Sequence, residues 1–182
     1  MEYQEINYNT EISPIEFEIL IKDYLQEIGN DLTDISIEHN KILNAHDGNY
    51  QIDVYAEFEA LNTKIKVLIE CKKHKNLIKR ETVQLLYDKI RANGAHKGII
   101  FATTGFQSGA QKFAKEHGIA LISIIDGILT CSIKSQDKEQ LKEIIKFWDV
   151  PKFVGEYKND NHICYLQKGY LDDLKEFITK VN

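Results

Sequence analysis

Apolar residues recur with a helical period at the start of the chain. They recur roughly at helical spacing from Ile15 onward, which predicts a helix that ends near Gly29. Ser13, Pro14 and Glu16 fit a serine cap, a proline at the first helical position and a capping-box glutamate. The segment therefore predicts a capped helix whose apolar positions are Ile15, Ile19, Tyr24, Leu25 and Ile28.

A two-residue alternation then predicts two strands, Gln51–Glu59 and Lys64–Lys72. Each has one apolar face, made by Ile52, Val54, Ala56 and Phe58 in the first and by Ile65, Val67, Ile69 and Cys71 in the second. The short connection Leu61-Asn62 makes the pair an antiparallel hairpin. Before it we expect a short strand at Ile35 and Ile37, then a loop from Asn44 to Asn49 containing Asp47-Gly48.

The following segment alternates helices with almost wholly apolar runs. We predict helices at Glu81–Asn93 and from Ser108, as a cap, to Gly118, with buried strands at Gly98–Thr103 and Ile119–Ile125. A strand, a helix and a strand joined by short links predict a right-handed parallel crossover. The predicted fold class is therefore α/β, with a mixed β-sheet flanked by helices and a core domain over residues 1–126.

Residues 127–182 predict a smaller extension. Its pattern favours a helix at Asp137–Trp148, a link at Pro151–Gly155, a strand at His162–Leu166 and a final helix at Tyr170–Val181. Such a tail covers the sheet, forms a dimer contact or binds a partner. We favour packing on the core.

Composition excludes several classes of protein. With 182 residues, 43% of them apolar, the chain can bury a core without disulfides or structural metals, and it has no apolar run of about 18 residues. The acidic N-terminus lacks the pattern of a secretory signal. Cys71, Cys131 and Cys164 have neither metal-site nor disulfide-framework spacing. We therefore expect a cytoplasmic protein with reduced thiols and no membrane association.

The net charge of −5 hides a strong asymmetry. From Cys71 to Lys97 the chain has eight Lys/Arg and two acids, a charge of +6, and the remainder carries −11. A basic stretch beside carboxylates suits a protein that grips a polyanion. Taken alone, the stretch is better explained as a solvated loop followed by an exposed helix face.

Asp53, Glu70 and Lys72 are the candidate catalytic residues. Alternation places Glu70 and Lys72 on one strand face, and a two-residue turn at Leu61-Asn62 places Asp53 opposite Glu70. Directly opposed Cβ atoms lie about 4.5–5.5 Å apart, a separation that one metal ion bridges. Two carboxylates and a lysine suit metal-assisted hydrolysis of a phosphodiester bond.

An ordinary solvated hairpin face is the alternative interpretation of the same residues. Opposed like charges are destabilising unless a cation lies between them, which favours a functional site. Spacing alone leaves both interpretations open.

Several stretches in a fixed order make the chain resemble the Mrr-like restriction endonucleases of the PD-(D/E)xK nuclease superfamily. The matching stretches are Phe17-Glu18, Asp47-Gly48, Gln51–Val54, Ile69–Lys72, Val83-Gln84 and Gly94–Ala110. The resemblance covers about Ile15 to Ile124 and implies a restriction-endonuclease-like fold. The proline of the superfamily motif is Ile52 here.

The resemblance also implies roles for individual residues. Asp53, Glu70 and the backbone carbonyl of Cys71 would bind Mg²⁺, for which Mn²⁺ can substitute, and Lys72 would position the nucleophilic water. Gln84 matches an accessory polar residue. Glu18 matches an acid that assists metal binding in some relatives, although a solvated helix acid is the alternative. The expected DNA contacts are Gln51, Lys73, His74, Lys75, Lys79 and Arg80.

The leading hypothesis is a metal-dependent endodeoxyribonuclease acting in restriction or defence. A homodimer is expected because two cuts on a duplex need two sites or two events. One alternative is a Holliday-junction or repair nuclease, and another is a catalytically inactive DNA-binding or assembly module. No DNA-recognition domain is evident, so a separate recognition or motor subunit is a candidate partner.

Overall fold

The computed structural model describes residues 12–29, 32–60, 62–126, 153–158, 163–166 and 172–179. Its elements are α1 (Pro14–Gly29), β1 (Thr33–Ala45), β2 (Gly48–Ala60), β3 (Thr63–Lys72), α2 (Arg80–Ala92), β4 (Lys97–Ala102), α3 (Ser108–Glu116), β5 (Ile119–Asp126), β6 (Phe153–Lys158), β7 (Ile163–Leu166) and α6 (Asp172–Thr179). None of the helices in these ranges is long and apolar enough to cross a membrane.

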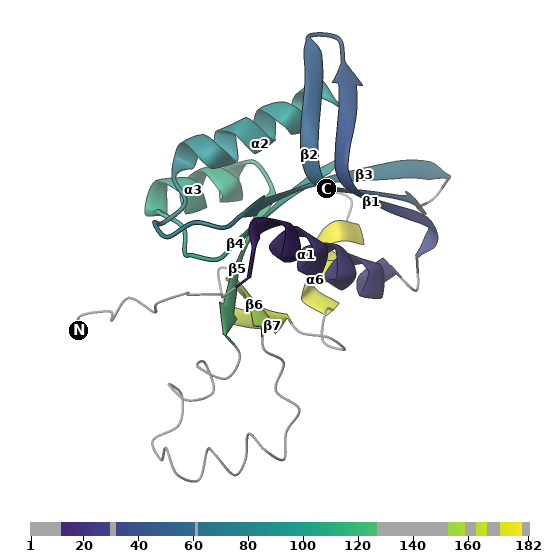
Figure 1. Ribbon diagram of the computed structural model, residues 1–182. Helices are drawn as coiled ribbons and strands as arrows, with labels where there is room; N and C mark the ends of the chain where they lie inside the picture. Colours follow the sequence, from purple (N-terminus) through teal and green to yellow (C-terminus); the bar gives the residue numbers. More distant parts are fainter. Residues whose placement is uncertain are drawn as a thin grey trace, which may run out of the picture.

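The described strands form one mixed sheet in the order β1-β2-β3-β4-β5-β6-β7. β3, β4 and β5 are parallel to one another, while the strands on either side pair antiparallel. α2 and α3, the two crossover helices, cover one face of the sheet, and α1 and α6 cover the other (Figure 1). The predicted α/β class with a mixed, helix-flanked sheet is confirmed.

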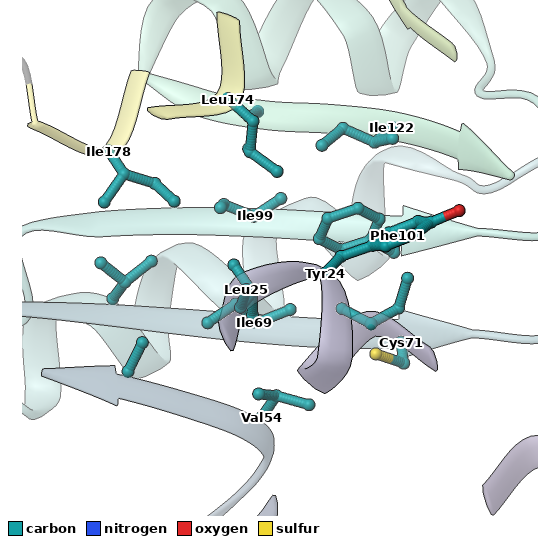
Figure 2. Close-up of a cluster of buried hydrophobic side chains, with 14 of the residues drawn as sticks. Tyr24, Leu25, Val54, Ile69, Cys71, Ile99, Phe101, Ile122, Leu174 and Ile178 are labelled. Atoms are coloured by element: carbon teal, nitrogen blue, oxygen red, sulfur yellow. The ribbon is translucent and has the colours of Figure 1, made fainter. Parts of the chain in front are cut away.

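The larger of two buried clusters joins α1 and α6 to this sheet. Figure 2 shows Tyr24 and Leu25 of α1 and Leu174 and Ile178 of α6 over a row of strand residues: Val54, Ile69, Cys71, Ile99, Phe101 and Ile122. Side chains from four adjacent strands thus meet two helices that are far apart in sequence. Burial of this apolar area holds the central strands rigid.

The capping box at the start of α1 is confirmed. The backbone N–H of Ser13 donates to Glu16 Oε2 at 2.6 Å, and that of Glu16 donates to Ser13 Oγ at 3.2 Å. The apolar positions expected at Ile15 and Ile19 do not lie in the core, since these residues are 62% and 45% exposed. The predicted positions Tyr24 and Leu25 are buried, and the other buried residues of this face are Phe17 and Ile21.

Tyr24 ties α1 to the C-terminal part of the sheet. Its hydroxyl donates to the backbone carbonyl of Phe153 in β6 at 2.7 Å. Burial, with a smaller contribution from the charge of Glu27, raises the pKa of Tyr24 to about 12. Ionisation above the unfolded-state pKa of about 10 therefore opposes folding.

Tyr24→Phe is expected to lower the free energy of unfolding by about 1 kcal/mol at pH 8, because the buried hydrogen bond is lost. Between pH 10 and pH 12 wild type loses stability that the variant keeps, roughly 1 kcal/mol by pH 11, so the difference closes. Urea unfolding of both proteins at pH 8 and pH 11 measures this. A difference that stays constant between the two pH values would contradict the assignment.

The β2–β3 hairpin has the predicted register. Pairs run from Val54 opposite Ile69 to Ala60 opposite Thr63, with two residues in the turn. The next pair outward would be Asp53 and Glu70, but the recorded pairing stops before it. The two acids therefore lie where the strands begin to separate.

β1 and β2 are longer than the predicted strands, and the hairpin that they form rises beyond the sheet as an arm (Figure 1). The expected loop from Asn44 to Asn49 is wrong: Asn44 pairs with Asn49, Ala45 pairs with Gly48, and two residues make the turn. Backbone pairing does not require apolar side chains, so this polar arm gave no alternating signal. The predicted short strand at Ile35 and Ile37 is the first part of β1.

A change of face occurs in β2 at Asp53. Ile52 packs in the second cluster, on the side of α2 and α3, whereas Val54 packs in the first cluster. On the neighbouring β1, Asn40 has a φ of 54° and does not pair with Asp53. The prediction that Ile52 shares a face with Val54 is therefore wrong, because the two-residue period of β2 breaks where the β1–β2 pairing is irregular.

The ends of α2 and α3 follow the sequence more closely than their starts. Gly94 and Gly118 follow the helices with φ of 58° and 63°, as expected for C-terminal glycines. Ser108 is not the cap of α3: Gln107 holds that position without a side-chain bond. The backbone N–H of Gln107 is bound to the carbonyl of Ile78, so the helix begins directly after it.

The C-terminal residues add to the same sheet. β6 pairs with β5, and β7 pairs with β6. The link expected at Pro151–Gly155 is wrong, since β6 begins at Phe153. Gly155 lies inside β6, where a Cβ would approach side-chain atoms of Ile122 and Leu166 to 3.2 Å. The glycine therefore marks close packing within the sheet and not a link. β7 and α6 lie where a strand and a final helix were predicted. The helix expected at Asp137–Trp148 lies outside the described residues, and the boundary at 126 stays a prediction.

Candidate active site

Asp53, Glu70 and Lys72 come together where β2 and β3 separate. The Cys71 backbone N–H donates to Asp53 Oδ2 at 2.7 Å, and Lys72 Nζ donates to Glu70 Oε1. Glu70 is only 8% exposed, while Asp53 and Lys72 are half-buried. The hairpin register and this side-chain bond together hold two carboxylates and an ammonium group on one rigid surface.

A fourth residue, Lys89 of α2, completes the cluster. Its Nζ lies 2.8 Å from Glu70 Oε2 and 2.9 Å from the backbone carbonyl oxygen of Gln51. We did not predict this residue, which counted only as part of the basic stretch. The signal was its place three residues after the buried Leu86, from which a long side chain reaches along the sheet.

The environment of Asp53 disfavours its charged form. Burial, and next the neighbouring charge of Glu70, raise its pKa above the ordinary value. The Cys71 N–H and the Lys72 ammonium offset this only in part. Two carboxylates share a partly dry site, and an added cation would relieve their repulsion.

Lys72 stays protonated at this site. Burial acts to lower its pKa, but attraction to Glu70, the hydrogen bond between them and the charge of Asp53 together raise the pKa above the ordinary lysine value. An ammonium group donates hydrogen bonds and accepts none. Lys72 can therefore orient a water molecule or stabilise negative charge, rather than remove a proton.

The donor set fits a hard divalent cation. Asp53 and Glu70 each offer carboxylate oxygens. The Glu70 carboxylate already pairs with two positive groups, the ammonium groups of Lys72 and Lys89. Among the described residues no three His, Cys, Asp or Glu side chains form a metal-binding group. Mg²⁺ is typically bound by one or two carboxylates and keeps several waters, so the two acids suffice. The Cys71 carbonyl stays the predicted third ligand.

Glu18 lies at the edge of this site. Its Oε2 is bound to Nε2 of His39 on β1, and its charge contributes to the raised pKa values of Asp53 and Cys71. Burial is the main cause of the raised Cys71 pKa. The proximity of Glu18 suits an assisting role, but one of its oxygens already has a partner, and metal ligation by it stays a prediction.

The side chains of the two predicted glutamines make no hydrogen bond to Asp53 or Glu70 among the described residues. Gln84 is exposed on α2, and in the ranges that the structure describes its side chain makes no hydrogen bond. The Gln51 side chain donates to Asn40 Oδ1 at 2.7 Å. Only the Gln51 backbone reaches the site, through Lys89. The accessory role of Gln84 and the DNA contact of Gln51 stay predictions.

The basic loop after β3 is exposed yet firmly held. All of its predicted DNA contacts are exposed: Lys73, His74, Lys75, Lys79 and Arg80. Thr103 Oγ1 binds the N–H and the carbonyl of His74, each at 3.1 Å, and Thr104 Oγ1 donates to the carbonyl of Asn76. A bridge between Ile78 and Phe106 closes the loop. Positive side chains thus project from a fixed backbone directly after Lys72.

Comparison with protein families gives one match over most of the chain. Residues 10–127 match the Mrr_cat family model, described as restriction endonuclease. A curated relative from Escherichia coli (strain K12), "Type IV methyl-directed restriction enzyme EcoKMrr", is 27% identical over 118 residues. The alignment covers 62% of this chain and 36% of the relative, so the chain spans about a third of that protein's length.

A solved structure of low sequence identity shares the fold. A crystal structure of AF1548, a protein of unknown function, superposes with a TM-score of 0.50 at 24% identity, covering 60% of this chain and 57% of that chain. The MspJI restriction endonuclease in complex with a 27-mer oligonucleotide gives a TM-score of 0.43 at 17% identity, covering 59% of this chain and 25% of that chain.

Proposed function

This chain belongs to the restriction endonuclease family of the Mrr_cat model, and from that premise we propose that it is a metal-dependent endodeoxyribonuclease that hydrolyses DNA phosphodiester bonds. The observation that carries the proposal is the cluster of Asp53, Glu70 and Lys72 at the end of a rigid hairpin. Its oxygen donors suit Mg²⁺ or Mn²⁺. Restriction or defence is the proposed setting.

Each residue of the cluster has a distinct part in the proposed reaction. Asp53 and Glu70 would hold the divalent cation, with the carbonyl of Cys71 as a further oxygen ligand. When bound, the cation polarises the phosphate and lowers the pKa of a coordinated water. Lys72, as an ammonium group, would orient the attacking water and stabilise the charge that develops on the phosphate oxygens. Gln84 is proposed as an accessory polar group from α2.

The basic loop is proposed as the DNA-binding surface. Lys73, Lys75, Lys79 and Arg80 would pair with backbone phosphates, and His74 and Gln51 would add polar contacts. Phosphate contacts fix the position of the duplex without reading its sequence. Thr103 and Thr104 hold the backbone of this loop in place. A bound DNA strand would therefore pass close to Lys72 without the loop first having to become ordered.

The partners and location of the whole protein are proposals of the same kind. A homodimer would cut both strands of a duplex, and a separate recognition or motor subunit would supply sequence selection. Cytoplasmic DNA is the proposed substrate. Methyl-directed cleavage is stated of the Escherichia coli relative, and for this chain it is a substrate class to be tried.

Nicking of supercoiled plasmid tests the proposal. Wild-type protein is incubated with Mg²⁺, with Mn²⁺ and with EDTA, beside a Glu70→Gln protein purified in the same way. We expect cleavage that needs the metal and is absent from the variant. Equal cleavage by both proteins would point to a contaminant. No cleavage of plain, methylated or branched DNA, with DNA binding retained, would favour the inactive binding module.

A further inference from the structure

Lys89 has a position that the proposed chemistry does not use. Its side chain is largely buried, and its Nζ contacts Glu70 Oε2 and the carbonyl oxygen of Gln51 at 2.8 and 2.9 Å. Lys72 Nζ contacts the other oxygen of the same carboxylate. Both oxygens of Glu70 are therefore bound to ammonium groups.

The contacts of Lys89 also join β2 to β3 beyond the point where the two strands stop pairing. The recorded β2–β3 register stops at Val54 opposite Ile69, and beyond it Lys89 links the Gln51 carbonyl of β2 to Glu70 of β3. The Lys89 ammonium group donates hydrogen bonds to a carboxylate oxygen and to a backbone carbonyl oxygen. Those are the oxygen types that bind Mg²⁺ and Mn²⁺ in proteins.

We infer that Lys89 is an internal counter-cation of the metal site: a positioning residue whose ammonium group neutralises Glu70 and competes with a divalent cation for Oε2. Lys89 thus fixes the carboxylate geometry and lowers the metal affinity of the protein without DNA. The inference rests on the metal-dependent activity proposed above.

The charges predict the direction of the effect. A positive charge within hydrogen-bond distance of a metal ligand repels a divalent cation and competes for the same oxygen. Without the Lys89 charge, one ammonium group fewer offsets the negative charges of Asp53 and Glu70, so these carboxylates attract a divalent cation more strongly. If Lys89 had only a structural role, its replacement would loosen the site and lower the metal affinity.

Direct Mn²⁺ binding to DNA-free protein tests the inference, with free Mn²⁺ measured by electron paramagnetic resonance. Lys89→Met is expected to bind Mn²⁺ at least about tenfold more tightly than wild type, because one competing charge is gone. Lys89→Gln, which keeps a neutral donor, should do the same if the methionine variant folds poorly. Lys89→Arg, which keeps the charge, should bind as wild type does.

Arg91→Met is the matched control, since Arg91 is exposed on the same helix and lies over the Tyr87 ring. It should leave Mn²⁺ affinity unchanged. Equal or weaker binding by folded Lys89→Met and Lys89→Gln proteins would overturn the inference, and the nuclease proposal would stand if wild type still cleaves DNA with Mg²⁺. Absence of Mn²⁺ binding from wild type and every variant would overturn both.

Discussion

Asp53→Asn is expected to reduce DNA cleavage at least about a thousandfold, because metal stabilisation of the transition state is worth several kcal/mol. Asparagine keeps an oxygen that can accept the Cys71 N–H but loses the charge that holds a cation. Single-turnover cleavage of a labelled duplex in Mg²⁺ measures the loss. The control is Asp88→Asn, an exposed acid on α2, which should cleave as wild type does.

The same variant is expected to be slightly more stable than wild type in EDTA at pH 7. Burial and Glu70 raise the pKa of Asp53, so its charged form opposes folding, and wild type loses this stability as the pH rises above the unfolded-state pKa. Removing the charge should add about 0.5 kcal/mol to the free energy of unfolding, a figure reduced for solvent screening. Near pH 3 the difference should vanish. Urea unfolding at both pH values would contradict the account if the variant were less stable at pH 7.

Lys72→Met is expected to reduce cleavage by about a hundredfold to a thousandfold, the usual loss when one donor that stabilises transition-state charge is removed. The methionine keeps most of the aliphatic stem and removes only the ammonium group. Mn²⁺ binding should persist and become tighter, since the carboxylates are untouched and the ammonium group that lies against Glu70 Oε1 is gone. The expected signature is therefore a variant that binds metal and DNA but does not cut.

Lys73→Met is the matched control for this change. Lys73 is the next residue and is exposed, so its loss should weaken DNA binding modestly and spare the cleavage rate of bound DNA. Single-turnover rates at saturating protein separate the two effects. A Lys72→Met protein that cleaves bound DNA at the wild-type rate would remove Lys72 from the reaction.

The hairpin and the adjacency of its acids could be predicted because they depend on local rules. A two-residue period and a two-residue turn determine which residues of β2 and β3 face each other, and the structure keeps that register to Val54. The apolar strands β4 and β5 are equally evident, since strands buried on both faces have few polar residues. The mixed sheet follows from these elements and their short links.

What the sequence missed depends on departures from period and on distant contacts. The change of face at Asp53 lies opposite the left-handed Asn40 of β1, and nothing in the alternation announces it. Lys89 reaches Glu70 from another element, and its place three residues after Leu86 does not by itself indicate which strand residue it contacts. On α1, the prediction placed Ile15 and Ile19 in the core, whereas Phe17 and Ile21 are the residues buried there.

The position of a bound metal ion tests the central claim most directly. Crystals of wild-type protein soaked in Mn²⁺, at a concentration that supports cleavage, would locate the ion by its anomalous scattering. We expect the strongest peak between the carboxylates of Asp53 and Glu70, with the Lys89 ammonium moved away from Glu70 Oε2. An ion bound elsewhere, with Glu70 still held by both lysines, would contradict the proposed active site.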